Sequence, residues 1–176
     1  LEAGFRFAKP TIEDFFEGTD HAVVDRLDLH RYMGTWYEIA RFDHRFERGL
    51  SEVTATYTLM PDGTVRVENR GCKHKKPYDV CKTAEGRAKI PDPSQPGKLK
   101  VSFFLSFYSD YYVLELDQDE YNYALIGSSS DKYLWILSRA PILPEEIKKK
   151  LLDAATRRGY DVKKLIWVEQ REKKIM

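Results

Sequence analysis

Long apolar runs are missing from this sequence, and their absence excludes a membrane-spanning helix. The longest uninterrupted stretches cover only a few residues, as at 134–137, whereas a helix that crosses a bilayer needs about 20. A dominant charge is missing as well, because 29 Lys and Arg against 28 Asp and Glu leave a formal charge of +1. No overall field is therefore expected to gather nucleic acid or an anionic membrane. We expect any partner to bind through shape and apolar contact.

Cysteine is scarce, and its scarcity argues against a metal site. Cys72 and Cys81 are the only two, and they lack the second pair that a zinc site would require. If the strands on either side of them are paired, the two residues emerge about 5 Å apart, within reach of a disulfide. We predict a disulfide that closes the loop between these strands. The alternative is a pair of free thiols in a reducing compartment.

Histidine is the natural candidate for catalysis, and the sequence has few histidines. None of the four has a neighbouring serine or cysteine in a recognisable nucleophile motif. They are His21, His30, His44 and His74. We therefore predict no catalytic residue and no cofactor.

Short β-rich runs separated by turn residues recur from residue 34 onward. Val53, Ala55 and Tyr57 alternate with threonines, which is the period of a strand with one buried face. The turn residues 61–63 follow and predict a hairpin. Eight strands are predicted in all, at 35–43, 52–60, 64–70, 83–90, 98–105, 111–117, 121–127 and 133–139.

One amphipathic helix follows the strands. Pro144 suits its first turn, Leu151 and Ala155 fall on one face, and Gly159 can end it. Residues 165–169 are predicted as a short ninth strand. Residues 1–26 show no clean period and are expected to form an arm or short helix outside the main core. The principal domain is then expected to span residues 27–176.

Eight similar strands with short connections favour an antiparallel up-and-down barrel, because a sandwich needs at least one long crossover connection. Such a barrel has room for one small ligand. Small residues at predicted inward positions favour a cavity, although they can equally lie beneath large neighbours. These residues are Ala40, Ala55, Ala84, Gly86 and Ala88.

Three motifs occur in the order and spacing of the lipocalin signature. They are Gly34-Thr35-Trp36-Tyr37, the turn at 117–123 and Arg139 at the end of the eighth strand. The longer runs at 34–49, 131–139 and 166–170 resemble the bacterial outer-membrane lipoprotein lipocalins, which are relatives of apolipoprotein D. The resemblance covers residues 25–170. It implies an all-β, eight-stranded barrel with the helix packed outside.

The resemblance also implies roles for individual residues. In the family, the tryptophan plugs the closed end of the barrel and the arginine lies across its ring, as a cation–π contact allows. Gly34, Trp36 and Arg139 are therefore expected to be structural. The loop after the first strand overhangs the open mouth, where His44 and residues 45–48 would gate entry, meet a polar head group, or simply pack.

Localisation follows from the same resemblance. Bacterial members usually begin at a lipidated cysteine, and both cysteines here lie elsewhere in the chain. We expect the bacterial envelope, with membrane association only through an anchor outside the printed residues. The sequence leaves a monomer and a homodimer equally open.

Inward parity along the strands predicts an aromatic lining that suits an acyl chain with a small polar end. Glu38 shares this parity and has no evident inward partner, so we expect a hydrogen-bonded structural carboxylate rather than an acid–base catalyst. The predicted lining consists of Ala40, Phe42, Ala55, Tyr57, Val67, Phe103, Tyr112, Leu114, Tyr123 and Trp135.

The expected function is the binding, and transport or storage, of a fatty acid, lysophospholipid or similar amphiphile, without catalysis. Two alternatives stay open. One is a lipocalin-type isomerase, which acts on a bound lipid with a cysteine in its cavity. The positions of Cys72 and Cys81 argue against it, because both flank a loop. The other is an interaction module with a filled barrel, whose acidic arm or helix binds a protein.

Overall fold

The computed structural model describes residues 18–104 and 107–171 of the chain. Within these ranges, nine antiparallel strands form one sheet that closes on itself, because β1 (Gly34–Phe42) pairs with both β2 (Ser51–Leu59) and β8 (Leu134–Ser138). The short β9 (Leu165–Trp167) is added to β1. The predicted barrel of eight strands with a ninth short strand is therefore confirmed.

The other strands follow in up-and-down order, each beside its neighbour in sequence. The hairpin of β3 and β4 is longer than predicted, because the ladder continues through Cys72 and Cys81. These strands are β3 (Val65–Lys73), β4 (Val80–Lys89), β5 (Lys98–Phe104), β6 (Phe107–Leu116) and β7 (Tyr123–Gly127). Leu105, predicted to end the fifth strand, lies outside the described residues, as do positions 1–17 of the arm and 172–176.

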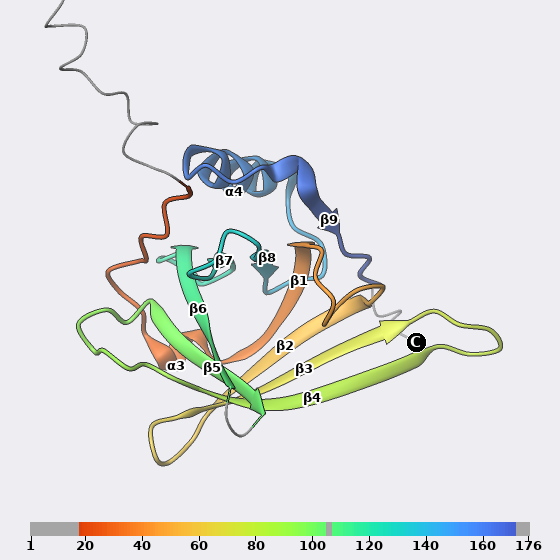
Figure 1. The fold of residues 1–176 in the computed structure, drawn as a ribbon, viewed down its shortest axis with the longest axis horizontal. Coiled ribbons are helices and arrows are strands. Elements are labelled where there is room, and N and C mark those ends of the chain that lie inside the picture. The colour runs from red at the N-terminus through yellow and green to blue at the C-terminus, as the bar shows by residue number, and fades with distance from the viewer. Residues whose placement is uncertain (1–17, 105–106, 172–176) are drawn as a thin grey trace, which may run out of the picture.

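Helix α4 (Glu145–Arg157) packs on the outside of the barrel, as predicted (Figure 1). The helix begins after Pro144. Gly159 lies just beyond its C-terminal end and has a φ of +94°, a conformation that glycine adopts without strain. The 3-10 helix η1 (Val162–Lys164) then leads into β9. None of the described helices is long and apolar enough to span a membrane.

The short helix α3 (Leu29–Tyr32) lies at one end of the barrel (Figure 1). The Asp28 carboxylate caps it by accepting hydrogen bonds from the first backbone N–H groups. Just before it, the described part of the arm lies against the barrel: Val24 donates to the carbonyl of Val113 at 3.0 Å, and its side chain packs on the inner core. This part is therefore not outside the core, and the boundary at residue 27 stays a prediction.

Two apolar clusters lie on the two sides of the barrel wall. The inner cluster lies inside the barrel and includes Trp36, Tyr57, Val67, Leu99, Val113 and Ile126. The outer cluster lies between the wall and α4 and includes Phe42, Leu125, Ile136, Leu151 and Ala155. Strands β1, β6, β7 and β8 contribute to both clusters, so they are covered on both faces.

Candidate ligand-binding barrel

The closed end of the barrel is built around Trp36. Its indole is fully buried and donates a hydrogen bond to the carbonyl of Tyr32 at 2.9 Å. The guanidinium carbon of Arg139 lies 3.9 Å from the centre of the indole ring. Gly34 has a φ of +97°, and a Cβ there would lie 3.3 Å from Nη1 of Arg139. The predicted stacking of arginine on tryptophan is thus present, with the glycine beside it.

Three tyrosines fill the barrel above this plug. The hydroxyl of Tyr111 is hydrogen-bonded to those of Tyr32 and Tyr57. Burial raises the pKa of all three phenols, so they are neutral donors and acceptors. A cavity of only about 10 Å³ is left beside them, the room of one water molecule. The lower half of the barrel is therefore filled.

Beyond the tyrosines, part of the inner wall of the barrel is exposed to solvent. Strand alternation places Asn69 and Ala84 on the inner face, as continuations of the buried positions Val67 and Gly86. Asn69 is nevertheless half-buried and Ala84 exposed. Water therefore reaches this part of the inner wall.

Five residues of the predicted lining belong to the inner cluster. Phe103 covers Gly86, where an added Cβ would lie 2.8 Å from the phenyl ring. Small residues here therefore make room for large neighbours, which is the second of the two readings that the sequence left open. The five are Ala55, Tyr57, Val67, Phe103 and Trp135.

The prediction that Ala40 and Phe42 face inward is wrong. The β1–β8 register shifts between Glu38 and Ala40, and such a bulge reverses the alternation of side chains beyond it. Both residues lie in the outer cluster under α4. Arg41 takes the inward position instead and is 2% exposed.

The prediction is also wrong for Tyr112, Leu114 and Tyr123, which belong to the outer cluster. Their strands are apolar on both faces because α4 covers the outside, so alternation carries no signal. In β6, a register shift after Val113 adds a second irregularity. The inward side chains of this strand include Tyr111.

A buried polar network connects the second half of β1 with the loop that follows it. Arg41 donates to the Glu38 carboxylate at 3.3 Å and to the backbone carbonyls of Glu47 and Leu50 at 2.8 and 3.2 Å. The Glu47 carboxylate accepts from the indole N–H of Trp135 at 2.9 Å. Glu38 is inward-facing, as predicted, but it has partners that sequence reasoning missed.

The pKa values of the two carboxyls in this network are shifted in opposite directions. Burial and the nearby Glu47 raise the pKa of Glu38 well above its ordinary value. Burial alone would also raise the pKa of Glu47, but hydrogen bonds from His44, Glu38 and Trp135 outweigh it and lower this pKa to about 2. Glu38 therefore holds its proton more tightly than an ordinary glutamate, whereas Glu47 ionises more readily. Nε of Arg41 and Oε2 of Glu47 are buried and have no hydrogen-bond partner among the residues that the structure describes.

His44 ties the loop after β1 into this network. Its Nε2 lies 2.7 Å from Oε1 of Glu47, and its ring packs edge-on against Tyr133 and Trp135. Of the roles considered for this loop, packing is what the contacts display. Gating and head-group contact stay predictions.

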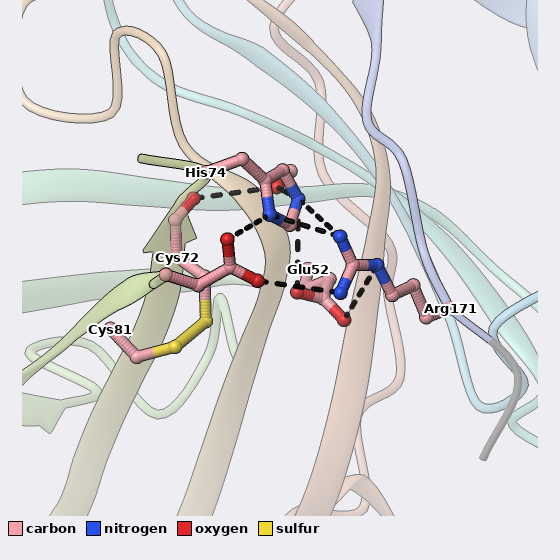
Figure 2. Close-up of a disulfide and its surroundings, with 7 residues drawn as sticks. Glu52, Cys72, His74, Cys81 and Arg171 are labelled. Carbon is pink, nitrogen blue, oxygen red and sulfur yellow. Dashed lines mark hydrogen bonds and ion pairs between the residues drawn. A yellow bond between two sulfur atoms is a disulfide. The ribbon is translucent and has the colours of Figure 1, made fainter. Parts of the chain in front are cut away.

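The disulfide between Cys72 and Cys81 is present, as predicted (Figure 2). The two residues lie directly opposite each other in the β3–β4 ladder, with Cα atoms 4.0 Å apart. The bond closes the connection between the two strands.

Beside the disulfide, β2 contributes Glu52 and the β3–β4 connection contributes His74 and Asp79 to one group. Figure 2 shows Glu52 and His74 close to each other. One possible metal-ligand atom from each lies within 4.8 Å of the others. The guanidinium of Arg171 is among them, with Nη2 3.0 Å from Nδ1 of His74 and Nη1 3.4 Å from Asp79. A cation of the chain itself thus satisfies this group. No local motif signals the whole group, because Glu52 and Arg171 are distant in sequence from His74 and Asp79.

A closed barrel with a plug at one end and aromatic side chains on its inner face has the architecture of a protein that binds a small apolar ligand. Residues 27–170 match the family model described as a lipocalin-like domain. The chain belongs to the lipocalin family, whose members bind small hydrophobic ligands.

Relatives support this assignment. The chain is 50% identical to the outer membrane lipoprotein Blc of Citrobacter freundii over 84% of its own length and 82% of the relative's. It is 35% identical to mouse (Mus musculus) apolipoprotein D over 84% and 79%. Among solved structures, insecticyanin of the tobacco hornworm Manduca sexta superposes with a TM-score of 0.69 at 24% identity, covering 87% and 86% of the two chains. This last likeness shows the fold.

Proposed function

We propose that the protein binds one long-chain amphiphile, a fatty acid or lysophospholipid, inside the barrel, on the side of the three tyrosines that faces away from Trp36. The observation that carries the proposal is the solvent-accessible inner wall at Ala84 and Asn69. Phe103 and Trp135 add half-buried aromatic side chains to the same inner face. Burying about ten methylenes contributes roughly 8 kcal/mol before ordering costs, which reduce the net affinity toward the micromolar range.

The proposed role is transport or storage in the bacterial envelope, without catalysis. Similarity to proteins named outer membrane lipoproteins supports the location, and the disulfide is compatible with an oxidising compartment. A catalytic cavity cysteine has no support, because Cys72 and Cys81 are bonded to each other.

The test is a titration with oleic acid and with a lysophospholipid, followed by tryptophan emission. We expect saturable quenching of the tryptophan emission, because Trp135 is half-buried on the inner face of the barrel. Trp135→Phe should remove most of the signal. The matched control Trp167→Phe should retain it, since Trp167 lies outside on β9 and is 48% exposed. Silent fluorescence together with silent calorimetry across chain lengths would overturn the proposal.

A further inference from the structure

The tip of the β3–β4 hairpin concentrates positive charge. Within residues 73–82, named here the basic tip, there is one acid, Asp79, and four lysines: Lys73, Lys75, Lys76 and Lys82. The tip therefore carries a net charge of +3. Because the whole chain carries +1, the remainder carries −2. The near-neutral total conceals a separation of charge.

This charge is not neutralised locally. Asp79 is engaged by His74 at 2.9 Å and by Arg171 at 3.4 Å. By contrast, none of the four lysines has an ion pair with any residue that the structure describes. Lys75, Lys76 and Lys82 are exposed and Lys73 is half-buried. The lysines are thus available to a negatively charged partner.

Aromatic side chains accompany the lysines. Tyr78, at the tip, is 72% exposed, and Phe46, in the loop after β1, is 64% exposed. These are the two largest exposed fractions among the large apolar side chains of the described ranges. Both loops follow odd-numbered strands of an up-and-down barrel, so they lie at the same, open end. The guanidinium of Arg45 lies 4.9 Å from the Phe46 ring.

The basic tip projects beyond its neighbours (Figure 1). Among the described residues, the pairing of β5 with β4 runs only from Arg87 to Lys89. The disulfide between Cys72 and Cys81 holds the base of the tip together. A flat surface can therefore reach the lysines and Tyr78 at once.

We propose that the basic tip docks the open end of the barrel on an anionic lipid surface. Lysines next to such a surface are attracted to it. Tyrosine side chains are enriched at the interface between membrane and water, because the ring is apolar and the hydroxyl is polar. A few lysines around isolated aromatic residues suit a membrane interface better than a nucleic acid, which needs an extended basic stripe. Docking would place the mouth of the barrel against the membrane, whatever ligand it carries.

The test is sedimentation of the protein with vesicles of phosphatidylcholine, with and without about one third phosphatidylglycerol. We expect binding to the anionic vesicles only, and loss of that binding at high salt. Lys75→Gln with Lys76→Gln should weaken it roughly 30-fold. The matched control, Lys148→Gln with Lys149→Gln on α4, removes the same charge and should bind like the wild type. Tyr78→Ala should weaken binding without changing its salt dependence.

Three results would overturn the proposal: wild-type protein that ignores both vesicles, equal losses for the two double variants, or equally tight binding to a short DNA duplex. The fluorescence titration with oleic acid, repeated on the Lys75/Lys76 variant, keeps the two proposals apart. A variant that binds oleic acid normally but not vesicles has lost docking alone.

Discussion

Glu47 accepts a hydrogen bond from the indole N–H of Trp135 at 2.9 Å, which ties the loop after β1 to strand β8. The same carboxylate is close to His44, and the backbone carbonyl of Glu47 accepts from Arg41. One side chain thus connects the loop to the wall of the barrel. Its ionisation is therefore linked to the stability of the fold.

Glu47→Gln should lower the free energy of unfolding by about 1–3 kcal/mol at neutral pH. The pKa of Glu47 falls from 4.5 to about 2 on folding, so its carboxylate stabilises the protein above the unfolded pKa and loses that effect as the pH falls through about 2. The difference between variant and wild type should shrink across this window. Urea denaturation at several pH values measures it, and a constant difference would contradict the prediction.

Glu38→Gln should behave differently. The raised pKa of Glu38 means that stability is greatest below its unfolded pKa and declines as the pH rises toward the folded value. Glutamine resembles the protonated form, so the variant should cost less than Glu47→Gln at neutral pH and should flatten the decline. Parallel urea titrations of the two variants compare them. A larger loss for Glu38→Gln would mean that Glu38 is ionised.

Arg139→Ala should destabilise the protein by about 1–3 kcal/mol without changing ligand selectivity. It removes the contact with Trp36 and hydrogen bonds to the carbonyls of Tyr121, Thr35 and Arg31. Thermal unfolding and oleic acid titration measure the two properties separately. A normal melting temperature with abolished binding would show that this residue contacts the ligand.

Gly34→Ala and Gly63→Ala form a matched pair. Both glycines have a positive φ, +97° and +85°, but an added Cβ meets Arg139 at 3.3 Å in the first and nothing within 4 Å in the second. Each should lose about 1 kcal/mol to backbone strain. Gly34→Ala should lose more, because the arginine must shift. Chemical denaturation decides, and equal losses would remove the argument for close packing.

Replacing Cys72 and Cys81 together by serine should lower the free energy of unfolding by about 2–3 kcal/mol, as expected for a bond that closes a loop of about ten residues. The separation is nine positions. Maleimide labelling of denatured, unreduced wild-type protein should detect no thiol. Two labels per chain would contradict both the disulfide and an oxidising compartment.

The sequence predicted secondary structure correctly wherever one face of a strand or helix is exposed to solvent and the other is buried. Threonines alternating with Val53, Ala55 and Tyr57 mark β2 correctly, and the apolar stripe of α4 marks the helix. The two cysteines could be paired because they flank one hairpin. Short-range patterns of this kind determine the fold class.

The candidate site was predicted only in part, for physical reasons. Alternation has no meaning for Tyr123 in a strand buried on both faces, and a bulge at Ile39 reverses it for Phe42. Contacts between distant segments, such as Glu47 with Trp135 88 positions away, leave no local pattern. These contacts make up the polar wall of the barrel.

The bulge in β1 divides the labour of one strand. Before it, Trp36 and Glu38 face the interior; beyond it, Ala40 and Phe42 support α4 while Arg41 points inward. Substitutions at 38 and 41 therefore change the inner side of the wall, whereas those at 40 and 42 change the packing of the helix on its outer side. The bulge lets consecutive residues of one strand vary for the interior and for the exterior independently.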